Sequence, residues 1–384
     1  MVKSRADGRQ ASPKLAGFLA DHDAKTRVVE IGTAPHPVFA EEMRGATHLN
    51  FDFALQGVTD RTLDLVFLKV AAYDADGTLG AYRYLNRNAV GQAGIETVGP
   101  TTIAGREVVD LFNPFHTFPS EVGVNELRYM FTFRDAETGE EFYYGNVIVR
   151  PWRYRQQAVL GVPVKGLVTV LDGYDFYSHH RRFAMSVARA ATDGAMQSNF
   201  ARYALDFVHI GEDGNTRRMS DEERRGNYDF HFVDARRFYS DGAPIYAPGS
   251  GVVAVAEDGH EDLYDEAFDF DAAVAGGRVG DMAGNHVAIE HNAAEFSHLF
   301  HLKKGSVAVE VGQRVSAGDL VGHIGFSGAA TLYSHLHYQF MDGPDFLDAA
   351  ALPVRFNEIT LVRGGRRELL HDAPLDTGDI AWVE

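Results

Sequence analysis

Short runs with an apolar residue at every second position recur along the chain and most strongly limit the folds it can adopt. One such run, HLNFDFAL, spans residues 48–55, and another, ELRYMFTF, spans 126–133. A period of two directs the apolar side chains to one face of a β-strand. The turn-forming segments DADG and DAETGEE separate such runs. Several short strands with one buried face each predict a β-sandwich over residues 45–150.

The length of 384 residues is that of about two domains. Short apolar runs punctuated by glycine return after Pro151 and predict a second β-rich domain over 151–384. This domain carries a polar insertion at 211–242 and an acidic loop near 257–282. Residues 1–44 are expected to form an N-terminal arm or a short helix. The predicted fold class is therefore mainly β.

The net charge of −18 limits the partners of the chain. Binding to nucleic acid needs a basic face, and adhesion to anionic membranes or wall polymers needs positive charge, so we expect neither. No stretch approaches the ~18 consecutive apolar residues of a membrane span, and the N-terminal run LAGFLA is too short for a signal peptide. Cysteine is absent, which excludes disulfides, thiolate metal sites and cysteine nucleophiles.

Three histidines and one aspartate stand in contexts that suggest a metal site. His335 and His337 flank Leu336 on a strand-like run, so both imidazoles face the same side. His301 ends another β-run, just before a glycine turn. Asp206 lies inside the apolar run YALDFV, where a carboxylate facing inward is costly unless it is paired or bound to a metal.

The C-terminal part of the chain resembles the lysostaphin/LytM-type zinc metallopeptidases in several motifs that occur in the same order. The segments APIYAPGSGVVAVA, GNHVAIEH, HLKKGSVAVEVGQRVSAGDLVGHIGFSG and SHLHYQFM are similar to successive motifs of that family. The resemblance is continuous over about 243–342 and extends more loosely back to 151. The preceding β-rich domain also resembles the N-terminal modules of some larger members.

The resemblance implies a β-rich fold with a groove, one Zn²⁺ per chain and hydrolysis of peptide bonds in bacterial peptidoglycan. It implies that Asp206 and His337 are metal ligands, and that His301 and His335 act on the attacking water and the oxyanion. An open zinc position for water, and imidazoles beside it, agree with these roles. It also implies an extracytoplasmic location, periplasmic or secreted. The substrate partners would be peptidoglycan peptides, while a protein partner is left open.

The family's first motif is His-x-x-x-Asp, but Arg202 stands four residues before Asp206. Arginine is not a zinc ligand, so another histidine must complete the site or the zinc is lost. We expect His180 of the doublet YSHHRRF to replace it, on a strand next to the one through Asp206. His179 is the runner-up, because adjacent strand residues face opposite ways.

Arg202 also supports an alternative function, a catalytically inactive module that binds cell wall or regulates a partner hydrolase. Other histidines fit the site less well. His298 and His209 lie three residues from His301 and Asp206, respectively, and strand parity directs them to the opposite face.

Overall fold

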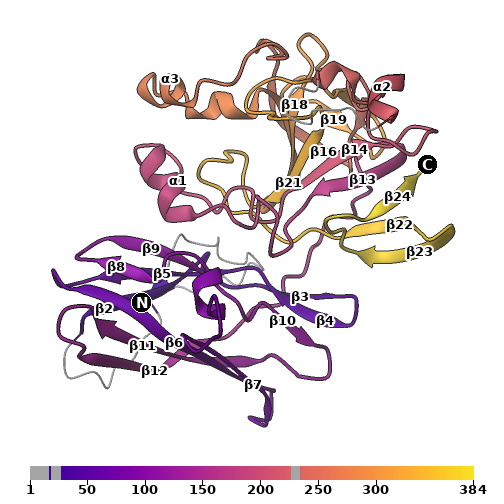
Figure 1. Cartoon of the computed structure of the whole chain (residues 1–384). Coiled ribbons are helices and arrows are strands. Elements are labelled where there is room, and N and C mark those ends of the chain that lie inside the picture. Colours follow the sequence, from indigo (N-terminus) through magenta and orange to yellow (C-terminus); the bar gives the residue numbers. More distant parts are fainter. Residues whose placement is uncertain (1–16, 19–26, 226–233) are drawn as a thin grey trace, which may run out of the picture.

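The computed structural model describes residues 17–18, 27–225 and 234–384. Its strands form two separate groups, with β2 to β12 in the lower part of Figure 1 and β13 to β24 in the upper part. Each group surrounds its own hydrophobic core. The prediction of a mainly β fold is confirmed.

The N-terminal part is a β-sandwich built from two main sheets. Aromatic residues of the two sheets meet in its core, where the ring of Phe53 lies 4.8 Å from that of Tyr129 and 5.0 Å from that of Phe131. The apolar alternation noted in the sequence accounts for this burial, because each strand turns one face inward.

The first sheet has the order β1-β2-β5-β9, with strands Gly17–Phe18, Val29–Ala34, Asp52–Gly57 and Val108–Phe112. The second has the order β12-β11-β6-β7, with β8 paired to β6, and its strands are Glu141–Val149, Glu126–Asp135, Thr62–Tyr73, Leu79–Asn86 and Thr102–Ala104. A small sheet of order β10-β4-β3 contains Thr117–Pro119, Ala46–Leu49 and Ala40–Met43.

The expectation of an arm or short helix over 1–44 is wrong for residues 29–43. Strand β2 pairs with β5, and β3 pairs with β4. The run VVEIG alternates apolar side chains into the sandwich core, where Val29 and Ile31 are buried. Phe39 instead packs into the C-terminal core. Most of the first 26 residues lie outside the described part of the chain.

The C-terminal part is organised around one ten-stranded sheet of order β19-β16-β17-β18-β21-β14-β13-β24-β22-β23. Its central strands β18 and β21 are buried at every residue, as expected of strands covered on both faces. The strands in this order are Arg314–Val315, Gly251–Glu257, Asn285–Asn292, Glu295–Leu302, Leu336–Met341, Leu205–His209, Gly166–Asp172, Ile380–Val383, Phe356–Arg363 and Arg366–Ala373. A separate pair consists of β15 (Pro244–Tyr246) and β20 (Leu320–His323).

The helices of the described residues are short and lie at the edges of the fold. They are α1 (Met185–Ala191), α2 (Asp221–Arg224) and α3 (Phe270–Ala275), with 3-10 turns η1 (Gly94–Thr97), η3 (Ala235–Arg237) and η4 (Val279–Ala283). The polar insertion thus contains α2 and η3, and the acidic loop contains α3 and η4. Among the described helices, none has the length and apolar character needed to cross a membrane.

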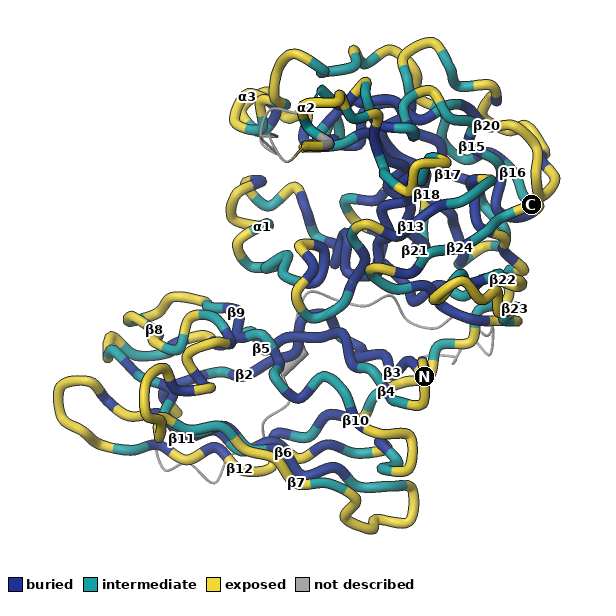
Figure 2. The backbone as a smooth tube through the Cα atoms, turned by 45° about the vertical axis from the view of Figure 1, so that its right-hand side comes forward, coloured by how far each residue is buried: buried dark blue, intermediate teal, exposed yellow. Residues whose placement is uncertain are grey.

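Figure 2 shows dark blue, buried backbone in the middle of both parts and yellow, exposed backbone at their outer loops. The segment from β13 to β14, residues 172–205, contains α1 and contacts the N-terminal sandwich, since α1 lies against β9. This segment also contains His179 and His180, the histidine doublet expected at the candidate site.

Candidate metal centre

The centre of the candidate site is a cross-strand pair on the long sheet. Asp206 on β14 lies directly opposite His337 on the neighbouring strand β21. Opposed residues in an antiparallel pair have side chains close together on one face. Asp206 Oδ1 is 3.1 Å from His337 Nδ1. Asp172, at the end of β13, is the register partner of Asp206 on its other side.

His180 reaches this pair from a turn rather than from a strand. Strand β13 ends at Asp172, so the expectation that His180 ends a strand next to Asp206 is wrong. The chain turns back after β13, and the Nδ1–H of His180 donates to the carbonyl of Gly173, 3.0 Å away. His180 Nε2 then lies 3.6 Å from Asp206 Oδ1, buried and without a hydrogen-bond partner among the described residues.

His179 takes a different position from its neighbour. Its side chain is 67% exposed and pairs with Asp172, while the side chain of His180 is 1% exposed. The structure therefore brings His180, and not His179, to Asp206 and His337. The turn and the backbone acceptor at Gly173 determine which of the two histidines faces Asp206. The strand parity used in the sequence argument does not.

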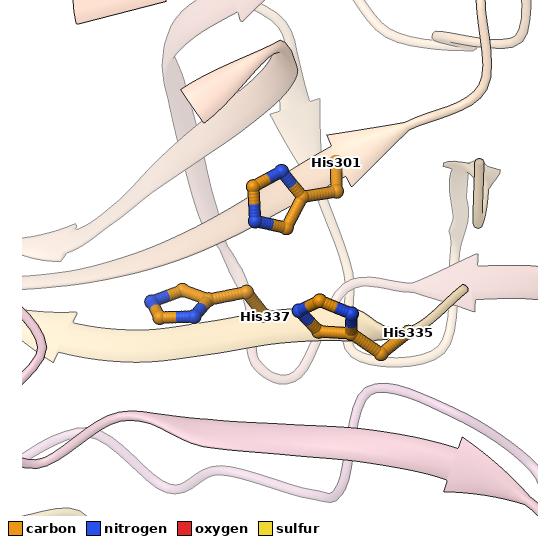
Figure 3. Close-up of side chains that lie close together, drawn as sticks. All are labelled: His301, His335 and His337. Atoms are coloured by element: carbon orange, nitrogen blue, oxygen red, sulfur yellow. The ribbon is translucent and has the colours of Figure 1, made fainter. Parts of the chain in front are cut away.

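His301 and His335 complete the cluster, as Figure 3 shows together with His337. His301 has a backbone φ of 64° at the end of β18, an uncommon conformation for a residue with a side chain. Its Nδ1–H donates to the carbonyl of Ser327 at 2.9 Å. The Nδ1–H of His335 donates to the carbonyl of Tyr333 at 2.8 Å, which leaves Nε2 of His335 3.4 Å from Asp206 Oδ1.

His337 is held on three sides. Its Nε2–H donates to Gln339 Oε1 at 3.1 Å, and its ring packs nearly parallel to those of Phe300 and Phe200, at 5.4 and 5.8 Å. A second acceptor for one ring nitrogen fixes the tautomer and aims the lone pair of the other nitrogen. Nδ1 of His337 therefore presents its lone pair toward Asp206.

Because of these hydrogen bonds, the imidazole nitrogens that face one another inside the cluster carry lone pairs and no protons. His180, His301 and His335 each donate Nδ1–H to a backbone carbonyl, and His337 donates Nε2–H to Gln339 in the tautomer that leaves its Nδ1 unprotonated toward Asp206. Their remaining nitrogens and a buried carboxylate therefore face one another as acceptors. A buried carboxylate is costly in that setting unless a cation lies among the acceptors.

The donor set fits a divalent transition metal. His180, Asp206 and His337 form one group whose ligand atoms all lie within 4.8 Å of one another, and His301, His335 and His337 form a second. Two imidazoles and one carboxylate with an open fourth position are a ligand set used by catalytic zinc. Nε2 of His180 is buried and has no hydrogen-bond partner among the described residues. This is the most direct indication that a ligand binds there.

The electrostatics keep these groups in the states that metal binding requires. Burial lowers the pKa of His180 to about 3 and lowers the pKa of His301 and His335, so their rings are neutral at pH 7. Burial alone would raise the pKa of Asp206, but attraction to the protonated forms of His335 first and then of His180 outweighs burial, so this pKa lies well below its usual range and the carboxyl is ionised at pH 7. Ionised carboxylate and neutral imidazole are the metal-binding forms.

The cluster lines a cavity of about 410 Å³. Its wall combines the polar residues of the site with apolar side chains, among them Phe183, Met282 and Leu332. A cavity of this size, mostly apolar with a few convergent polar groups, has the character of a site for a small ligand or a peptide segment.

Arg202 is absent from this cavity. Its guanidinium is buried and donates to Asp52 of the N-terminal sandwich at 2.7 Å. The residue at the motif position therefore points away from the cluster, whereas His180 lies in it with Asp206 and His337.

Two residues of the site were not anticipated from the sequence. The Tyr333 hydroxyl donates to Asp206 Oδ2 at 3.0 Å, and burial raises the pKa of that hydroxyl, so it stays protonated. Gln339 holds His337, as described above. Both continue the period of two that contains His335 and His337, which is the sequence signal that could have identified them.

The histidines expected to lie outside the cluster do so. His298 is buried, and its Nε2–H donates to the carbonyl of Gly343 at 2.9 Å. His209 contacts the carbonyl of Lys165. Asp229 and His231 of the polar insertion, which the sequence would place on one face if their run were a strand, lie outside the described residues.

Comparison with known proteins gives matches to the C-terminal part. Residues 236–349 match the family described as Peptidase family M23. This stretch contains His301, His335 and His337 but begins after His180 and Asp206.

The chain is 28% identical over 152 residues to the peptidoglycan DD-endopeptidase ShyC of Vibrio cholerae serotype O1, a match covering 38% of this chain and 28% of that protein. It is 31% identical over 100 residues to the peptidoglycan DD-endopeptidase ShyA of the same organism, covering 26% of this chain and 18% of that protein. The chain thus spans less than a third of the length of these curated relatives. Among solved structures, LytU is 28% identical, with 28% of this chain and 60% of that chain covered and a TM-score of 0.21.

Proposed function

We propose, from the match of residues 236–349 to peptidase family M23, that this chain is a zinc-dependent endopeptidase hydrolysing peptide bonds of bacterial peptidoglycan. The proposal rests mainly on four imidazole nitrogens that carry no proton and one buried carboxylate. These groups lie close together and line one cavity. The endopeptidase names of ShyC and ShyA supply the substrate class.

His180, Asp206 and His337 would hold the metal. Zinc bound there would lower the pKa of a water toward ~7 and polarise the scissile carbonyl. Tyr333 keeps one oxygen of Asp206 occupied, so the other remains directed at the metal position. Gln339 keeps His337 in the tautomer whose Nδ1 lone pair points inward.

His335 and His301 would move protons and stabilise charge. The Nε2 atom of each is free of its own proton, because Nδ1–H is donated to a backbone carbonyl. One of these imidazoles takes the proton of the attacking water and returns it to the leaving amine. The other imidazole would take up a proton from solvent when substrate binds, so that its Nε2–H could donate to the developing oxyanion.

Arg202 no longer favours the inactive module. Its side chain has a buried partner elsewhere, and His180 lies close enough to Asp206 and His337 to serve as the third ligand in this proposal. The substrate would require an extracytoplasmic location, which is part of this proposal.

The proposal is tested by measuring zinc in protein purified without chelator and by digesting purified peptidoglycan. We expect about one zinc per chain and new amine-ended peptides by mass spectrometry, both lost with a chelator and restored by zinc. Stoichiometric zinc without any cleavage would instead favour the binding or regulatory module. Protein that takes up no zinc would contradict the proposal.

A further inference from the structure

A buried ion cluster joins the two parts of the molecule next to the candidate metal centre. Asp52 accepts from Arg181 at 2.7 and 2.8 Å and from Arg202 at 2.7 Å. All three residues are 1% exposed. Asp52 belongs to β5 of the N-terminal sandwich, whereas the two arginines belong to the C-terminal part.

The two arginines border the residues that form the metal centre. Arg181 directly follows His180, and Arg202 lies four residues before Asp206. Arg202 also donates to the carbonyls of Arg181, at 3.1 Å, and Phe183, at 3.3 Å. The turn that presents His180 is therefore held on its C-terminal side by a side chain that is itself fixed by Asp52.

Backbone contacts to the sandwich strengthen the same connection. Arg181 donates to the carbonyl of Phe51 at 2.9 Å, and the Asn50 amide donates to the carbonyl of Arg202. Consecutive residues of the sandwich thus contact both arginines. Such bonds are directional and fix the position of the turn, which apolar contacts alone would not.

Two further contacts place the rest of the segment against the sandwich. Asp110 of β9 accepts from the Ser186 backbone N–H at 2.9 Å and from its hydroxyl at 2.7 Å. The ring of His116 is stacked on Phe176 at 4.3 Å. Contacts at three places therefore hold the segment between β13 and β14 against the N-terminal part.

We propose that Asp52 is a positioning residue of the metal centre, so that the N-terminal sandwich is a structural component of the site. The proposal rests on the metal binding proposed above. In this arrangement Arg202 does not merely replace a ligand. It fixes the turn that supplies the replacement ligand, His180, and Asp52 fixes Arg202.

The test is Asp52→Asn in the full chain, with Arg44→Gln as the matched control. Arg44 also pairs across the two parts, with Asp379, but far from the metal ligands in the sequence and outside the cavity. We expect Asp52→Asn to weaken zinc binding about 10-fold or more in a competition titration, as loss of an outer support of a metal ligand does. The Co²⁺ absorption spectrum should change as well, and backbone amides of 173–183 should exchange hydrogen faster. Arg44→Gln should change none of the three.

A second variant covers the case in which Asp52→Asn does not fold. The triple variant Asp52→Leu, Arg181→Met, Arg202→Met replaces the ion cluster by apolar side chains, which buried clusters often tolerate. We expect it to fold but to bind zinc about 10-fold or more weakly. Unchanged zinc affinity in either folded variant would overturn the proposal. Failure of both variants to fold would overturn it too, in favour of a purely structural cluster.

The proposed function and this inference fail in different ways. Wild-type protein that binds no zinc contradicts the proposed function, while faster exchange at 173–183 in Asp52→Asn, but not in Arg44→Gln, still supports the positioning role. Wild-type protein that binds zinc, with Asp52→Asn equal to it in affinity, spectrum and exchange, contradicts only the positioning role.

Discussion

At the scale of single residues, two adjacent histidines have opposite environments. His180 is buried against Asp206, whereas His179 is mostly exposed and pairs with Asp172. We predict that His180→Ala reduces bound zinc below about a tenth of the wild-type content, because two remaining ligands hold zinc poorly. His179→Ala should retain zinc. The measurement is zinc content after gel filtration, for both variants in parallel.

The result assigns the ligand directly. Loss of zinc only in His179→Ala would move the ligand by one residue, and retention in both variants would remove the doublet from the site. A circular dichroism spectrum of each variant controls for folding.

His301 is predicted to act in turnover and not in holding the metal. We expect His301→Ala to keep its zinc and to lose activity on the order of 10²-fold or more, as for other proton-transfer or oxyanion groups. His209→Ala is the matched control, since the ring of His209 makes its one described hydrogen bond to the carbonyl of Lys165, and its loss should leave the rate unchanged. Activity of His301→Ala within a few-fold of wild type would exclude a catalytic role.

At the scale of elements, strand β21 and the residues before it place four polar side chains at alternate positions. Tyr333, His335, His337 and Gln339 each make a different contact to the same cluster. We predict that Gln339→Leu lowers zinc affinity about 10-fold, because His337 loses the acceptor that sets its tautomer. Gln339→Glu keeps an acceptor oxygen and should restore most of the affinity. Equal zinc affinity of Gln339→Leu and wild type would show that the tautomer is set otherwise.

The strands were predictable from the sequence because alternation is a local signal, and the structure confirms a mainly β chain. The pairing of Asp206 with His337 follows once both are placed on neighbouring strands. The turn of His180 was not predictable, because its position depends on a backbone acceptor and on contacts to another part of the chain. The φ of 64° at His301 likewise depends on tertiary structure. Residues 29–43 were misjudged because their strands pair with partners further along the chain.

At the scale of the whole molecule, buried neutral histidines make stability depend on pH. Burial lowers the pKa of His298 to about 3. The unfolded chain, with a histidine pKa of about 6.5, then takes up a proton that the folded protein does not. The free energy of unfolding is therefore reduced by this residue as the pH falls through 6.5 toward 3.

We predict that His298→Gln removes this share of the pH dependence, since glutamine does not titrate and its amide can still donate to Gly343. Between pH 6.5 and 5.5, metal-free wild type should lose about 1 kcal/mol more than the variant. Urea denaturation at both pH values, with a chelator present, measures the difference. Equal losses in the two proteins would show that His298 titrates alike in the folded and unfolded states.

The connection between the two parts lay beyond the reach of sequence patterns. Asp52 and Arg202 are 150 positions apart, and neither residue type nor spacing marks them as partners. Arg202 was informative from the sequence only as a missing ligand. Its partner, Asp52, is identified only in the folded structure, where β5 lies next to the segment after β13.

The buried cluster also limits how this protein can change over evolutionary time. Exchanging Arg202 for histidine alone would restore the family motif but remove one of the two arginines that bind Asp52. The exchange would leave Asp52 with Arg181 as its one arginine partner and would remove the hydrogen bonds that Arg202 donates to the buried carbonyls of Arg181 and Phe183, and a buried polar group left unpaired is costly. Positions 52, 181 and 202 are therefore expected to covary, and a lineage that has once adopted this arrangement is unlikely to revert by single substitutions.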